Sequence, residues 1–245
     1  MRNFLKVAVL LAAVAPFAAN AAVSTTLHNL STTGTGTVKA SAETQICKFC
    51  HTPHGANQQR AIWNHTATVQ AFNWGAGNLV TTTGTTLPTT FSSVTLKCLS
   101  CHDGSVAIGS VANNGAGVAG TIAMNASTHL TAGALNAAAG ANVVGLGGNL
   151  QGNHPTGIPY AGEPGSKAVA VAANGYYPVL AAGCGSASGV CINNGADGLL
   201  VNLVLNGAVR TVDCTSCHDP HGTLNTFLLL IPATSSRICL ACHNQ

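Results

Sequence analysis

The pattern Cys-x-x-Cys-His occurs four times in this chain, at residues 47–51, 98–102, 214–218 and 239–243. It is the attachment pattern of a c-type haem, in which both thiols bond to the porphyrin and the histidine reaches the iron from one side. A single copy is also compatible with chance or with half of a zinc site. Four copies predict four covalently bound haem c groups and a protein that moves electrons.

The pattern assigns eight of the ten cysteines and four of the ten histidines. The predicted covalent attachment residues are Cys47, Cys50, Cys98, Cys101, Cys214, Cys217, Cys239 and Cys242. The predicted proximal iron ligands are His51, His102, His218 and His243. The other two cysteines, Cys184 and Cys191, are expected to form a local disulfide in an oxidising compartment. Two free thiols or an intermolecular bridge are the alternatives.

The first 21 residues are typical of a secretory signal peptide. Arg2 and Lys6 precede an apolar stretch from Val7 to Ala19, and Ala19-Asn20-Ala21 supplies a cleavage site. An uncleaved membrane anchor is the alternative, but the apolar stretch is shorter than the ~20 residues that span a bilayer. We therefore expect an exported protein, located outside the cell or on its outer surface, with the periplasm as the alternative.

The composition offers little material for an ordinary core, since only 4% of the residues are aromatic and 6% are charged. Four porphyrins can supply the missing apolar surface, so we expect no stable fold without haem. Residues 103–213 contain no haem motif and many Gly, Ala and Asn residues, without helical periodicity. We predict one haem-centred domain over residues 22–245, mostly irregular, with short helices at the haem motifs and a few short strands. Residues 196–209 are expected to form a hairpin or strand pair with a turn at Asn206-Gly207.

Six further histidines can supply the second axial ligand of each iron. The distal candidates are His28, His54, His154 and His221, with His65 in reserve. His54 and His221 each follow a proximal histidine by three residues, so they are placed to ligate an adjacent haem and not their own. His28 lies near the mature N-terminus and can bind a haem in its own subunit or in the next one. His129 is expected in a loop. Histidine on both sides of the iron favours low reduction potentials.

The motif order CKFCHTPHGAN, IWNH, CLSCHDGSVAIG, GNHP, CTSCHDPHG and ICLACHN resembles the doubled-CxxCH multihaem cytochromes. It is most similar to the outer-surface tetrahaem cytochromes of metal-reducing bacteria that polymerise into nanowires. The resemblance spans His28 to His243, but the stretch with Cys184 and Cys191 matches no family motif.

That family has bis-histidine haems stacked along a filament, and a histidine donated by one subunit to a haem of its neighbour. The resemblance therefore implies partners: copies of the same chain joined through His28, redox proteins, and extracellular acceptors such as metal oxides. The distal positions of the family match His28, His54, His154 and His221.

The sequence favours a non-enzymatic electron conduit, a filament subunit for extracellular electron transfer. A soluble periplasmic tetrahaem shuttle is the alternative, and it requires His28 to ligate within its own chain. A multihaem reductase is least favoured, because no motif has lysine in place of the proximal histidine and distal histidines are in surplus. No basic cluster indicates nucleic-acid binding.

Overall fold

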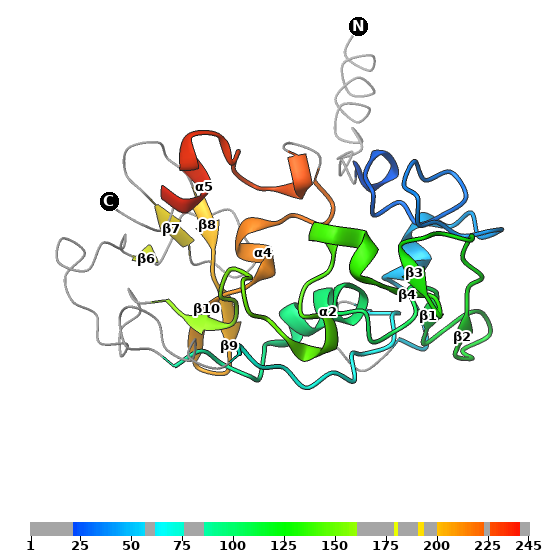
Figure 1. Cartoon of the computed structure of the whole chain (residues 1–245), viewed down its shortest axis with the longest axis horizontal. Coiled ribbons are helices and arrows are strands. Elements are labelled where there is room, and N and C mark those ends of the chain that lie inside the picture. The colour runs from blue at the N-terminus through cyan, green and yellow to red at the C-terminus, as the bar shows by residue number, and fades with distance from the viewer. Residues whose placement is uncertain are drawn as a thin grey trace, which may run out of the picture.

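The computed structural model describes residues 22–56, 62–75, 86–160, 179–180, 191–193, 200–222 and 226–240. In these ranges, short helical turns and strands of two to four residues are joined by irregular segments (Figure 1). The predicted signal peptide, Cys184, Cys242 and His243 lie outside the described residues, so their predicted roles stay predictions. No described helix has both the length and the hydropathy to cross a membrane.

Each haem motif begins in a helical turn. The first begins in the 3-10 helix η2 (Ile46–Phe49), and the second occupies the end of α2 (Ser93–His102), the longest described helix. The third lies in α4 (Cys214–Cys217) and the fourth begins in α5 (Arg237–Leu240). The side chain of Ser92 caps α2 by accepting from the backbone N–H of Thr95, as serine commonly does at this position.

Further 3-10 turns connect these segments. They are η1 (Ala22–Thr25), η3 (Ala137–Asn142), η4 (Leu146–Gly148), η5 (Thr226–Leu228) and η6 (Thr234–Ser236).

The strands of the described ranges form four small antiparallel sheets. Two of them are two-stranded pairs, β1 (Ser110–Val111) with β2 (Gly120–Thr121) and β3 (Leu130–Thr131) with β4 (Ala134–Leu135). One three-stranded sheet has the order β5 (Ile158–Pro159), β10 (Val209–Val212), β9 (Val204–Asn206). The other has the order β6 (Val179–Leu180), β7 (Cys191–Asn193), β8 (Leu200–Asn202).

The predicted strand pair is confirmed in β9 and β10, which pair with Asn206 opposite Val209. The two-residue loop between them is Gly207-Ala208. Gly207 has a φ of +64°, a conformation that glycine adopts without the strain of a side chain. The last strand runs on to Val212, so it leads directly into Asp213 and the third haem motif.

Buried apolar residues of the described ranges form four separate clusters. The largest joins Phe72, Trp74, Leu87, Phe91, Leu99 and Leu150. Cys50 packs against the cluster around Phe49, and Cys101 packs against the cluster around Ile108. These two attachment cysteines thus lie at the edges of small apolar clusters, where a porphyrin would add further apolar surface.

Candidate haem-binding site

Attachment cysteines of successive motifs lie close to one another. Their neighbouring pairs are Cys50 with Cys101, Cys98 with Cys214, and Cys217 with Cys239. The helix of the second motif, α2, packs against that of the third, α4. Figure 1 shows α2 and α4 in the middle of the molecule, with α5 beyond α4. The four motifs therefore follow one another in space in the order in which they occur in the chain.

The seven described motif cysteines are free thiols in mostly apolar surroundings. Burial raises the pKa of Cys50 to about 11 and also raises the pKa values of Cys101 and Cys217. The Cys98 thiol hydrogen-bonds to Cys214, which lowers the pKa of Cys214 to about 7 and raises that of Cys98 well above its ordinary value. The first thiols of the two inner motifs are thus in direct contact.

Two pairs of histidine rings from distant parts of the chain lie close together. The His51 and His221 rings have centroids 6.0 Å apart and nearly parallel planes, with an interplanar angle of 20°. The His28 and His102 rings have centroids 6.1 Å apart and are tilted by 53°. A metal–imidazole bond is about 2 Å long, so two imidazoles on opposite sides of one ion have centroids about 6 Å apart. Each pair combines a predicted proximal histidine with a predicted distal one at that spacing.

Two proximal histidines have a ring nitrogen engaged by the backbone. The Nδ1 atom of His102 lies 2.6 Å from the carbonyl oxygen of Asn142, and that of His218 lies 2.9 Å from the carbonyl oxygen of Phe227. Because a carbonyl only accepts, each Nδ1 donates, and Nε2 keeps the lone pair that a metal needs. Burial lowers the pKa of His102, which also favours the neutral ring.

His28 is held in place by the segment that follows the third motif. Its Nδ1 lies 3.4 Å from the carbonyl oxygen of Pro220. Burial and the neighbouring His102 lower the pKa of His28, so its neutral, ligating form is favoured. The N-terminal segment therefore reaches both inner motifs of its own chain.

The remaining histidines have other environments. His54 and His154 are exposed, and no ring contact is described for either within the described ranges. His65 is only 1% exposed, and its two ring nitrogens face the carbonyl oxygens of Thr66 and Ala107, which favours a structural role over axial ligation. His129 lies against the Thr37 hydroxyl at 2.9 Å, in a loop as expected.

Trp63 supplies a further test of whether haem fits these residues. Its indole N–H is buried without a hydrogen-bond partner, and its ring lies edge-on to His51 with the centroids 6.0 Å apart. The Lys97 ammonium lies 6.0 Å from the centre of the same ring. An unpaired buried donor is costly, so this corner suits a carboxylate acceptor. Haem propionates are such acceptors, and the residues present fit the group.

Sequence reasoning did not single out two buried acids beside the motifs. Asp103 directly follows His102 and is fully buried, and Asp213 directly precedes Cys214 and is 3% exposed. Their positions at the ends of motifs are visible in the sequence, but their burial depends on distant partners.

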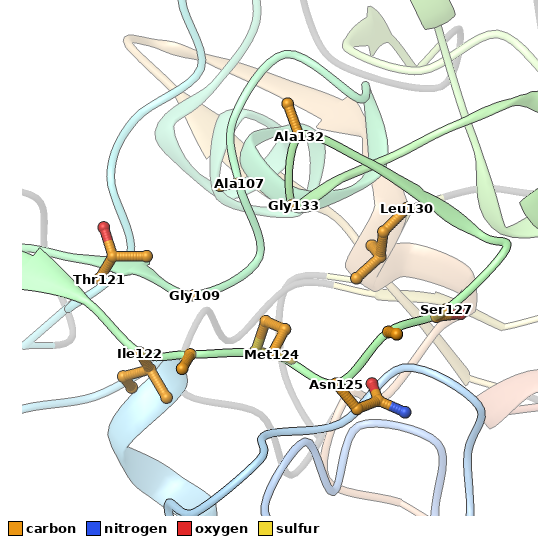
Figure 2. Close-up of a pocket in the computed structure, with 12 residues that line it drawn as sticks. Ala107, Gly109, Thr121, Ile122, Met124, Asn125, Ser127, Leu130, Ala132 and Gly133 are labelled. Carbon is orange, nitrogen blue, oxygen red and sulfur yellow. The ribbon is translucent and has the colours of Figure 1, made fainter.

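The hollow drawn in Figure 2 is not lined by the cysteines, histidines or acids described above. Its volume is about 290 Å³, and Ile122, Met124 and Leu130 contribute its larger side chains. No cysteine, histidine or acidic residue is among the residues that line it. It therefore offers neither attachment sites nor the histidine ligands described above.

Comparison with known families supports the haem assignment for the C-terminal part of the chain. Residues 206–245, which contain the third and fourth motifs, match the family model described as the doubled CXXCH motif. No curated protein matches the chain. The match supports a multihaem c-type cytochrome with covalently bound haem and a role in electron transfer.

Proposed function

We propose that this protein holds four haems in one continuous row and conducts electrons along them without bond chemistry. The observation that carries the proposal is the order in which the attachment cysteines neighbour one another, from Cys50 through the hydrogen-bonded Cys98–Cys214 pair to Cys239. Haem supplies the one-electron change at its iron, and potentials are set by ligands, burial and nearby charge. The protein is exported, as the N-terminal sequence indicates.

Each group of residues has a physical task in this proposal. The cysteines fix the porphyrins, and backbone carbonyls orient the His102 and His218 rings through Nδ1. The small apolar clusters exclude water beside the thiols. His221 comes from the third motif region and lies beside His51 of the first, so a haem iron held by both histidines would join the two halves of the chain.

The assembly state follows from where His28 binds. Resemblance to nanowire-forming cytochromes supports a filament subunit for extracellular electron transfer, with His28 donated across subunits. A second candidate is a discrete periplasmic carrier, and it is favoured by the position of the His28 ring against His102 of its own chain. Both forms use the same four haems.

The first experiment counts haems and tests their ligation. Mass spectrometry and a pyridine haemochrome assay of the purified protein should give four haems per chain. The reduced wild type should not bind carbon monoxide, whereas His221→Ala should open one iron per chain to it. His129→Ala is the matched control and should leave every iron six-coordinate. Fewer than four haems, or carbon monoxide binding to the wild type, contradicts the proposal.

Cryo-electron microscopy of the haem-loaded protein separates the two assembly states. Filaments with His28 crossing between subunits would establish the nanowire form. Monomers with His28 on the iron of their own second motif would establish the carrier. His28→Ala should dissociate the filament in the first case and open one iron of an intact monomer in the second.

A further inference from the structure

The six acidic residues of the chain are distributed unevenly around the haem motifs. Asp103 and Asp213 are buried, and each is adjacent in sequence to one of the two inner motifs, at 98–102 and 214–218. Asp219, by contrast, has 44% of its side chain exposed. The buried acids therefore belong to the middle of the haem row.

Asp213 lies between the helices of the two inner motifs. Its carboxylate accepts from the hydroxyl of Ser92 at 3.0 Å, from that of Thr95, and from that of Thr211 at 2.5 Å. It also caps α4, together with Ser216, in a reciprocal capping box. Since Ser92 and Thr95 lie at the start of α2, one carboxylate joins the helix of the second motif to that of the third.

The charge of these carboxylates has no ionic partner among the described residues. The donors to Asp213 are hydroxyl and amide groups, and those to Asp103 are the Thr68 hydroxyl and the backbone N–H of Ser105 at 2.8 Å. Donors of this kind match an ionised carboxylate, which can only accept. Asp213 acts electrostatically on Cys98 and Cys214, and Asp103 on Cys101 and His102.

The outer motifs have a different charge environment. Lys48 lies inside the first motif and pairs with Glu43 at 2.6 Å, so this pair has no net charge. Arg237 precedes the fourth motif at the start of α5. Lys97, which precedes the second motif, is only half-buried. Within the described ranges, the buried charged side chains beside the motifs are thus the two negative ones at the inner motifs, Asp103 and Asp213.

We propose that Asp103 and Asp213 lower the reduction potentials of the two inner haems below those of the two outer haems. The inference rests on the proposed tetrahaem function. A ferric haem has one positive charge more than a ferrous haem, so a nearby buried negative charge stabilises the oxidised state. Burial limits screening by water and salt, so a buried charge acts more strongly on a nearby haem iron than an exposed charge does. Electrons then enter and leave through the outer haems and cross a lower-potential pair in the middle.

The direct test is a redox titration of haem-loaded Asp213→Asn. Asparagine has nearly the same shape, and its side-chain oxygen can still accept from Ser92 and Thr95. Its amide nitrogen then faces Thr211, whose hydroxyl can donate to the Val204 carbonyl and accept from the amide, while the charge is lost. Two of the four midpoints should shift upward, each by about 59 mV or more, which is a tenfold change in the ferric-to-ferrous ratio for one electron. Asp219→Asn is the matched control: it removes the same charge beside the third motif, but water screens it, so its shifts should be smaller.

Asp103→Asn provides an independent test, with one upward shift for the haem attached at 98–102. If the midpoint shifts in Asp213→Asn and Asp103→Asn are no larger than those in Asp219→Asn, the proposal is overturned. Four wild-type midpoints within about 59 mV of one another would also overturn it, even if neither variant could be loaded. Haem content separates this failure from failure of the proposed function: four haems with unmoved midpoints reject only the role of the acids.

Discussion

Two buried polar networks fasten haem motifs to distant parts of the chain, and they differ in charge. In the Asn64 network, the Asn64 amide donates to the carbonyl oxygens of Lys48 and Asn113 at 2.5 and 3.1 Å and accepts from the backbone N–H of Asn113. In the Asp213 network, the carboxylate accepts from Ser92, Thr95 and Thr211. The first is neutral and holds one of the two outer motifs, whereas the second is charged and joins the inner motifs.

The comparison separates two roles of a buried polar network: holding a haem motif in place, and shifting the reduction potential of a haem. A neutral amide is sufficient to bind a motif segment to a remote loop, since the Asn64 amide hydrogen-bonds to the carbonyl oxygens of Lys48 in the first motif and of Asn113. A carboxylate in the same structural role leaves a charge beside the cofactor. Loss of either network should therefore destabilise the protein, but only loss of the Asp213 network should shift haem potentials.

The largest expected effect comes from removing the haems that both networks serve. Alanine at all eight attachment cysteines should abolish the cooperative thermal transition and leave a largely disordered circular dichroism spectrum, because the apolar clusters are small and separate. The matched control is alanine at Cys184 and Cys191, which lie outside the four Cys-x-x-Cys-His motifs. A cooperative transition in the haem-free variant would show that the polar networks and apolar clusters are sufficient for a stable fold without haem.

Asp213→Ala should destabilise the haem-loaded protein by about 3 kcal/mol, because it leaves buried hydroxyl donors without an acceptor and removes a helix cap. Denaturant titration measures this change in the free energy of unfolding. Asp213→Asn should lose only about 1 kcal/mol, since the amide oxygen still accepts. Equal losses in the two variants would indicate that charge, and not hydrogen bonding, holds α2 against α4.

Asn64→Ala should destabilise the protein by about 2 kcal/mol, since the carbonyl groups of Lys48 and Asn113 lose their donor. The decisive measurement is the accompanying redox titration, in which all four midpoints should stay in place. A shift as large as that expected for Asp213→Asn would remove the distinction between the two networks.

The local part of the site could be predicted from the sequence. Cys-x-x-Cys-His encodes its own geometry within five residues, so spacing alone predicts the attachment cysteines and the proximal histidines, and the family match supports this prediction for the third and fourth motifs. The Asn206-Gly207 pair likewise predicts a hairpin here, because turn chemistry is local, but the loop residues between β9 and β10 are Gly207 and Ala208, one position later than predicted.

The long-range part could not be predicted. The Ser92 and Asp213 side chains are 121 positions apart, and nothing in either segment indicates the other. The ring pairs His51–His221 and His28–His102 also depend on how distant segments pack. The pattern Trp63-Asn64-His65 makes His65 a reserve candidate for axial ligation, but its burial against Thr66 and Ala107 arises only in the folded chain.

The smallest expected effect concerns His65, which directly follows Asn64 in the sequence. It tests the surroundings of the neutral network through the pH dependence of the free energy of unfolding. Burial lowers the pKa of His65 below its ordinary value of 6.5, so the fold favours the neutral ring. Its contribution to stability is complete above the unfolded pKa of about 6.5 and is lost as pH falls through the lower folded pKa. The free energy of unfolding of the wild type should therefore fall more steeply between about pH 7 and about pH 5 than that of His65→Gln. His129→Gln is the control: because His129 is partly exposed, this variant should retain the wild-type slope. Identical slopes in all three proteins would contradict the prediction and would place the acid sensitivity in the axial histidines, which all three proteins share.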